Sequence, residues 1–167
     1  MIDPIFFATM LISATLLCSM VAGFLFAFAI VTMPGLKGLN DRDFIRAFQA
    51  IDGVIQNRQP IFIAVWVGSV VALLLSVALA SGVLGGYGRL LIISATLIYM
   101  LGVQLPTLII NVPLNNRLQL LQVDAVDAAT QQIARSAFEP RWNRWNAVRT
   151  TFAILTASQL IVVLFIF

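Results

Sequence analysis

The sequence predicts an all-α fold, a four-transmembrane-helix bundle with short amphipathic helices in two long cytoplasmic loops. Two observations predict this class. Of the 167 residues, 60% are hydrophobic and only 10% are charged, whereas soluble domains carry about 25% charged residues. Four segments also have close to or more than the roughly 20 apolar residues that a helix needs to cross the hydrocarbon core. We therefore expect a single membrane domain over residues 1–167.

The predicted spans cover residues 5–31, 60–80, 90–110 and 147–167. The first contains no charged residue and is long enough to tilt or to extend beyond the bilayer. The second begins at Pro60, because proline is tolerated in the first turn of a helix. A short glycine-rich turn, residues 81–89, joins the second span to the third and makes these two helices antiparallel neighbours.

Each long loop, residues 32–59 and 111–146, is predicted to contain a helix. In residues 41–56, large apolar side chains recur at spacings of three and four, which gives one apolar face. These side chains are Phe44, Phe48, Ile51 and Ile55. Residues 124–138 are rich in Ala and Gln and are predicted to form the second loop helix.

Small residues predict how the first two spans pack. They repeat at every fourth position, as Thr15, Ser19, Gly23 and Ala27 and as Ala64, Gly68, Ala72, Ser76 and Ala80. Lipid tails give helices no hydrophobic reason to associate, so close approach along small residues takes over. We expect these two helices to lie together, although small residues are also simply common in membrane spans.

Positive charge predicts the orientation. Eight of the ten Lys and Arg residues belong to the two long loops, and a ninth, Arg149, follows three residues after the second loop. Only Arg89 lies on the opposite side. The positive-inside rule then places both long loops in the cytoplasm and both termini outside. A bacterial inner membrane is the simplest assumption. The basic residues form no run, so membrane lipid is a better partner for them than nucleic acid.

The sequence has no histidine. This excludes His-ligated haem, His-based zinc or copper sites, and Ser-His-Asp or Cys-His catalysis. The single cysteine, Cys18, rules out an internal disulfide and is expected to be a small apolar filler within the first span. A metal held by carboxylates or tyrosine stays open but has no supporting pattern, so we expect no metal and no cofactor.

The candidate site begins at the cytoplasmic end of the third span. A polar stripe is predicted there because four residues follow one another at spacings of three, four and four: Gln104, Thr107, Asn111 and Asn115. Pro106 is expected to kink this helix. Polar amides near lipid cost free energy unless they are paired, so the stripe should face the bundle.

A second set of residues precedes the fourth span and shares one helix face: Trp142, Trp145, Asn146 and Arg149. A guanidinium at the edge of the hydrocarbon core costs about 2–3 kcal/mol unless it is partnered. The candidate partners are Asn111, Asn115, Glu139 and Asp52. The alternative is an ordinary aromatic belt, with arginines that extend to lipid phosphate.

Three motifs carry a family resemblance: Met33-Pro34-Gly35-Leu36, Asn111-Val112-Pro113-Leu114-Asn115, and Trp142-Asn143-Arg144-Trp145-Asn146-Ala147-Val148-Arg149-Thr150. Together they resemble the anthrone oxygenase-like membrane family, which is largely a domain of unknown function, over essentially the whole chain. The resemblance implies a small four-helix membrane protein. Some members oxidise anthrones to anthraquinones with dioxygen, without evident metal or flavin. The family leads us to expect Asn near the position of Asp52, so this acid leaves a shared substrate open.

The resulting hypothesis is a cofactor-independent oxygenase or binder of a lipophilic aromatic molecule, anthrone- or quinone-like, at the cytoplasmic membrane boundary. The predicted catalytic residues are Arg149, Asn111, Asn115 and Asp52, and the predicted substrate-binding residues are Trp142, Trp145, Asn146 and Gln104. Asp52 or Glu139 would be the base. The alternative is a non-enzymatic accessory subunit of a larger membrane complex. A transporter is the weaker third reading, because no charged residue lies in the middle of a span.

Overall fold

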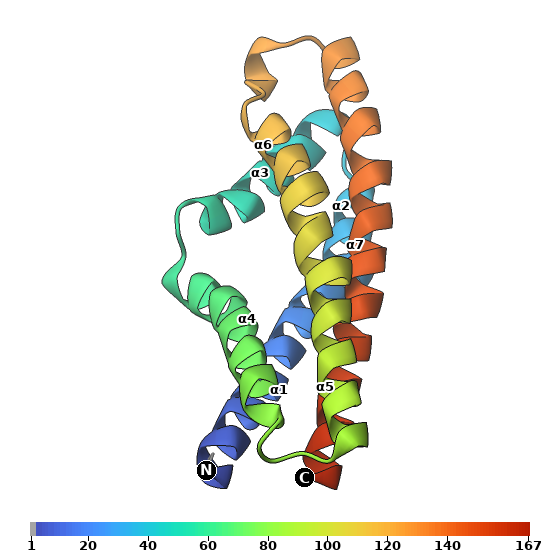
Figure 1. Ribbon diagram of the computed structural model, residues 1–167. Helices are drawn as coiled ribbons and strands as arrows, with labels where there is room; N and C mark the ends of the chain where they lie inside the picture. The colour runs from blue at the N-terminus through green and yellow to red at the C-terminus, as the bar shows by residue number, and fades with distance from the viewer. Residues whose placement is uncertain (1–2) are drawn as a thin grey trace.

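The computed structural model describes residues 3–167, and every regular element within that range is a helix. Four helical stretches are long and apolar enough to cross a membrane: Pro4–Lys37, Pro60–Ala80, Gly86–Gln119 and Ala128–Ile166. They stand side by side as a bundle, with the start of the first helix and the end of the last at the same end (Figure 1). The predicted all-α fold with four membrane-spanning helices is confirmed.

The first stretch is α1 (Pro4–Ala27), a π-helical segment η1 (Phe28–Thr32) and α2 (Met33–Lys37). Next comes α3 (Asp41–Gln56), which matches the predicted loop helix. Its N-terminus is capped by Asn40, whose side chain accepts a hydrogen bond from the Asp43 backbone N–H. A turn that contains Arg58 with a positive φ of 60° then leads into α4 (Pro60–Ala80).

The third stretch is α5 (Gly86–Tyr99), η2 (Met100–Gln104), η3 (Thr107–Asn111) and α6 (Val112–Gln119). The segments η2 and η3 are π-helical and flank Pro106. Proline lacks the N–H that an α-helix needs, and the wider turns on either side accommodate this break. The predicted disturbance at Pro106 therefore takes the form of two π-helical segments in a helix that continues to residue 119.

A 3-10 turn, η4 (Val123–Ala125), precedes α7 (Ala128–Ile166). The sequence predicted a loop helix over residues 124–138 and a separate span over 147–167, and this division was wrong. One 39-residue helix includes both segments and contains Pro140 in its interior. The arginine-rich segment between them is held in the helix because Phe138 and Trp142 are buried against α3.

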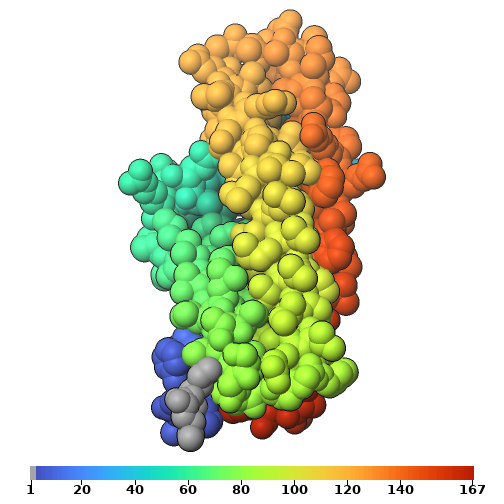
Figure 2. All heavy atoms as spheres, viewed as in Figure 1, coloured from blue at the N-terminus to red at the C-terminus, as the bar shows by residue number. Residues whose placement is uncertain are grey.

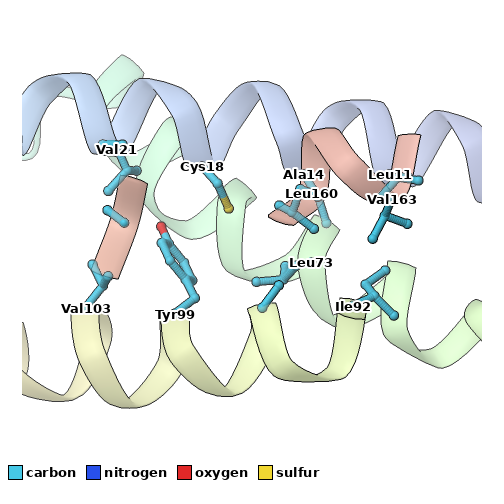
Figure 3. Packing of buried hydrophobic residues seen from close by; sticks show 14 of the residues in the cluster. Leu11, Ala14, Cys18, Val21, Leu73, Ile92, Tyr99, Val103, Leu160 and Val163 are labelled. Atoms are coloured by element: carbon cyan, nitrogen blue, oxygen red, sulfur yellow. The ribbon is translucent and has the colours of Figure 1, made fainter. Parts of the chain in front are cut away.

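The half of the bundle near the termini is packed with apolar side chains from α1, α4, α5 and α7, as Figure 3 shows. Cys18 is fully buried in this core, as predicted. The predicted pairing of the first two spans is confirmed, because α1 packs against α4. At Gly68 a β-carbon would lie 3.2 Å from Leu17 Cδ1, so the helices approach closely here and Leu17 would have to shift to admit a larger residue.

A second apolar cluster lies at the other end, where α3 packs against α6 and α7. Phe44 and Phe48 are buried in it, as the periodicity predicted. Ile51 is 36% exposed, however, and the neighbouring Asp52 is only 4% exposed. Asp52, and not the predicted Ile51, therefore lies on the inward face of α3. This part of the face borders the polar site described below.

Candidate functional site

A cavity of about 390 Å³ lies between α3, α4 and the three other long helices. Its size falls within the range of small-molecule sites, about 300–1,000 Å³. Figure 2 shows the face on which α3 and α4, cyan to green, stand beside the yellow atoms of η3 and α6. The cavity is lined by Phe24, Leu25, Phe28, Phe48, Asp52, Ile55, Gln56, Phe62, Trp66, Thr107, Leu108, Asn111, Val112, Asn115, Asn116, Trp142, Asn146 and Arg149.

Arg149 is the buried cation of this cavity, with 4% of its surface exposed. Its Nη1 donates to Thr107 Oγ1 at 3.1 Å and its Nη2 to Asn146 Oδ1 at 3.0 Å. Its Nε has no partner. Within residues 3–167, no carboxylate comes within salt-bridge distance of this guanidinium. A buried charge without a counter-ion is costly, so this guanidinium lowers the stability of the fold unless another group compensates for it.

Two asparagines surround the guanidinium. Asn146 donates through Nδ2 to the Leu25 carbonyl oxygen at 3.1 Å, which fixes its Oδ1 toward Arg149. Asn111 is 1% exposed and makes one long hydrogen bond, from Nδ2 to the Trp142 carbonyl oxygen at 3.5 Å. Its Oδ1 has no partner. Two cavity-lining residues on different helices, Arg149 and Asn111, therefore each contain a buried polar atom without a hydrogen-bond partner within residues 3–167, which is unusual in folded proteins.

Asp52 brings a carboxylate to the same cavity. Its Oδ1 accepts from Asn115 Nδ2 at 2.7 Å, and its Oδ2 accepts from Gln56 and Gln119, each at 2.9 Å. Asn115 in turn accepts from Trp142 Nε1 at 2.8 Å. A chain of hydrogen bonds thus links α3, α6 and α7. It also holds Asp52 in place without any cation.

Aromatic rings form much of the remaining wall. Phe62 and Trp66 are stacked with centroids 5.4 Å apart, and Phe24 contacts Phe62 at 5.4 Å. Phe28 lies 5.6 Å from Trp142, and the Arg149 guanidinium lies 5.7 Å from the same indole. The cavity therefore combines flat apolar walls with two separated opposite charges.

The structure places six of the eight predicted site residues around the cavity: Arg149, Asn111, Asn115, Asp52, Trp142 and Asn146. It does not place the other two there. Gln104 accepts from Trp66 Nε1 at 3.0 Å behind the cavity wall. Trp145 packs against the apolar cluster of α3, α6 and α7. The alternative base, Glu139, is also outside the lining and pairs with Arg135 at 2.7 Å.

Sequence reasoning missed the walls contributed by α1, η1, α3 and α4. The missed aromatic residues are Phe24, Phe28, Phe48, Phe62 and Trp66. A signal was present, because Phe24 and Phe28, and likewise Phe62 and Trp66, are four residues apart and therefore share a helix face. In apolar spans such pairs resemble ordinary lipid-facing residues, and only the packing reveals their role.

Fold and cavity together define a class: a helical protein with four candidate membrane spans and an aromatic-walled cavity that holds a guanidinium and a carboxyl group. The sequence model described as anthrone oxygenase matches residues 54–158, which include the motifs at 111–115 and 142–150 but not Asp52. The chain belongs to the anthrone oxygenase family. No curated protein and no solved structure matches it.

Proposed function

We propose that this protein binds an anthrone-like carbon acid in the cavity and promotes its oxidation by dioxygen. The observation that carries this proposal is Arg149, a buried guanidinium without a counter-ion that shares an aromatic-walled cavity with the carboxylate of Asp52. Family membership supports an oxygenase-like role. A cation and a carboxylate at separate points of the cavity suit a ketone that must lose a proton from carbon. The cation can hold the ketone oxygen while the carboxylate accepts the proton.

The reaction needs only the ligand and dioxygen. The base removes a proton from the CH₂ group of the anthrone, and the electron pair of that C–H bond is delocalised onto the ketone oxygen. The resulting carbanion forms a C–O bond with dioxygen and, after the proton returns, gives a hydroperoxide. Loss of the remaining C–H proton breaks the O–O bond and releases water. One anthrone and one dioxygen thus give one anthraquinone and one water.

In this scheme Arg149 holds the ketone oxygen as its negative charge develops, and Asn111 lies beside it. Oriented donors in a water-poor site stabilise such an oxyanion strongly, because they need no reorganisation. The Nε of Arg149 is buried and has no hydrogen-bond partner of its own among the described residues, so the guanidinium is not fully paired before a ligand binds. In the same scheme, an anionic ligand oxygen beside Arg149 offsets the free-energy cost of burying its guanidinium.

Asp52 is the base in this scheme. A carboxylate has about four acceptor positions, and the three amide donors leave one for a proton from the ligand. Asn115 is then a positioning residue, because its amide joins Asp52 to Trp142. Trp142 and the aromatic walls stack on the ligand rings and exclude water.

Oxygen uptake by the purified protein in lipid nanodiscs, with anthrone as substrate, tests the proposal. We expect one dioxygen consumed for each anthraquinone formed. Arg149→Gln should lower the rate by about a hundredfold or more, and Asp52→Asn by about a hundredfold. The matched controls Arg144→Gln and Asp43→Asn change exposed residues on the same helices and should retain activity.

Activity in the variants equal to that of their controls would contradict the assigned roles. Wild-type inactivity with several anthrones would contradict the oxygenase proposal itself. Stoichiometric co-purification with other membrane proteins would then favour the accessory-subunit alternative.

A further inference from the structure

The rim of the cavity has two chemically different edges. At one edge Gln56 Nε2 donates to Asn116 Oδ1 at 3.1 Å and joins the end of α3 to α6. At the other edge, the lining residues are apolar and face outward. Leu108 is 65% exposed and Val112 is 38% exposed, although both line the cavity.

The apolar edge continues into the outer surface of the spans. On the helix that carries Leu108, the exposed apolar side chains Leu97, Leu101 and Leu105 precede it at helical spacing, each more than 40% exposed. On α4, Ile63 and Val67 are also exposed beside Phe62. Such a continuous apolar surface on two predicted membrane spans is the surface that meets lipid. The edge at Leu108 therefore faces hydrocarbon.

The two helices that form this edge separate as they approach it. The helix α4 packs against α5 near the turn that joins them. In Figure 1, α4 then leans toward α3 while η3 and α6 continue along α7. The cavity lies between them, and Phe62 of α4 and Leu108 of η3 both line it.

We infer that the ligand enters the cavity sideways from the lipid bilayer, between Phe62 of α4 and Leu108 of η3, and that Leu108 controls the rate of entry. The inference rests on the proposed function, because it concerns the same lipophilic ligand. A flat apolar molecule dissolves in the bilayer rather than in water. If it enters through an apolar edge, it does not have to pass through water to reach the cavity. The hydrogen bond between Gln56 and Asn116 closes the polar edge.

Binding of anthraquinone to the protein in proteoliposomes tests this route through the quenching of tryptophan fluorescence in a stopped-flow instrument. Two of the three tryptophans, Trp66 and Trp142, line the cavity, so occupancy is reported without turnover. Leu108→Phe should slow association and dissociation about tenfold each and leave the Kd within about twofold, because an entrance changes rates but not equilibrium. Leu108→Ala should speed both rates.

Leu101→Phe is the matched control, since Leu101 is 61% exposed on the same helix but outside the cavity. It should bind like the wild type. Asn116→Ala, which breaks the polar bridge, should leave the association rate unchanged. Faster association in Asn116→Ala, with normal rates in both Leu108 variants, would place the entrance at the polar edge and overturn the inference. Absence of quenching in the wild type would instead refute the binding site itself.

Discussion

The two ends of this bundle differ in the polarity of their buried side chains and in how those side chains are paired. Near the termini, the core is apolar and buried hydroxyl groups are paired, as where Ser69 Oγ and Tyr99 Oη lie 2.7 Å apart. An exception at this end is Gln159 Oε1, which has no partner in the part of the chain that the structure describes. At the other end, Arg149 and Asn111 are buried with unpaired atoms. The first end uses regular α-helix, whereas π-helical segments occur next to the cavity. Under the proposed function, the apolar end provides stability, and the unpaired polar atoms at the other end lower stability in exchange for ligand binding.

The strongest test of this comparison is Arg149→Met. If Arg149 serves binding, the variant should lose anthrone oxidation by about a hundredfold or more and have a higher Tm, because a buried unpaired charge has been replaced by an apolar side chain of similar length. Thermal unfolding in detergent and oxygen uptake measure the two effects. A lower Tm would mean that Arg149 is primarily structural.

The apolar end should respond in the opposite way. Leu73 is fully buried there, so Leu73→Ala should cost about 2–5 kcal/mol of stability through the cavity that it leaves. The activity of the protein that remains folded should not change, because Leu73 is outside the candidate site. Equal losses of specific activity for Leu73→Ala and for the site variants would remove the distinction between the two ends.

A substitution at Gly102, in η2, should also lower the stability of the protein, but by less than Leu73→Ala. A β-carbon at Gly102 would overlap the ring of Phe152. Gly102→Ala should therefore destabilise the protein by about 1–3 kcal/mol through overpacking, measured as a lower Tm. Gly23→Ala is the control, since a β-carbon there meets no atom within 4 Å. A wild-type Tm for Gly102→Ala would show that η2 and α7 can separate at no cost in stability.

Two tryptophans of α7, Trp142 and Trp145, test which residues line the cavity. Trp142→Phe should weaken anthraquinone binding about threefold to tenfold, since aromatic contacts are worth about 0.5–1.5 kcal/mol beyond their burial. Trp145→Phe should bind normally, because Trp145 packs outside the cavity. Fluorescence titration measures both affinities. Equal weakening in the two variants would contradict the assigned cavity lining.

The smallest effect is expected at the surface. The hydrogen bond from Arg42, together with the charges of Arg42 and Arg46, lowers the pKa of Asp124. A lowered pKa in the folded state stabilises the protein above the ordinary pKa of about 3.9, and this stabilisation is lost as the pH falls through the lowered value. Because these groups are exposed, Asp124→Asn should change the Tm only slightly at pH 7, and the change should become smaller as the pH falls through the lowered pKa of Asp124. A large change at pH 7 would contradict this.

Hydrophobic length and periodicity were enough to predict the four spans and the helix 41–56. They failed at residues 124–146, where polar composition suggested a loop. There a helix continues through Pro140 because tertiary packing of Phe138 and Trp142 overrides the local signal. Local sequence cannot show such packing, since its partners belong to α3.

Most polar residues of the cavity lining were predictable because such residues are rare in membrane spans and recur at helical spacing. Gln104 and Trp145 lie outside the lining for geometric reasons. The π-helical turns on either side of Pro106 change the register that an α-helical spacing assumes. Trp145 lies roughly 60° around the helix from Trp142, which is enough to turn its ring into the neighbouring apolar cluster. The residues that α1 and α4 contribute to the cavity wall could be recognised only once the fold was known.

The most direct test of the central claim is the absorption spectrum of anthrone bound to the protein without oxygen. If Arg149 supplies the missing partner of an anionic oxygen, binding to the wild type should convert the ketone into its coloured anion at a pH where the free ligand stays neutral. The Arg149→Gln variant should bind anthrone without this change. Equal amounts of anion in both proteins, or a neutral ligand in the wild type, would contradict the account.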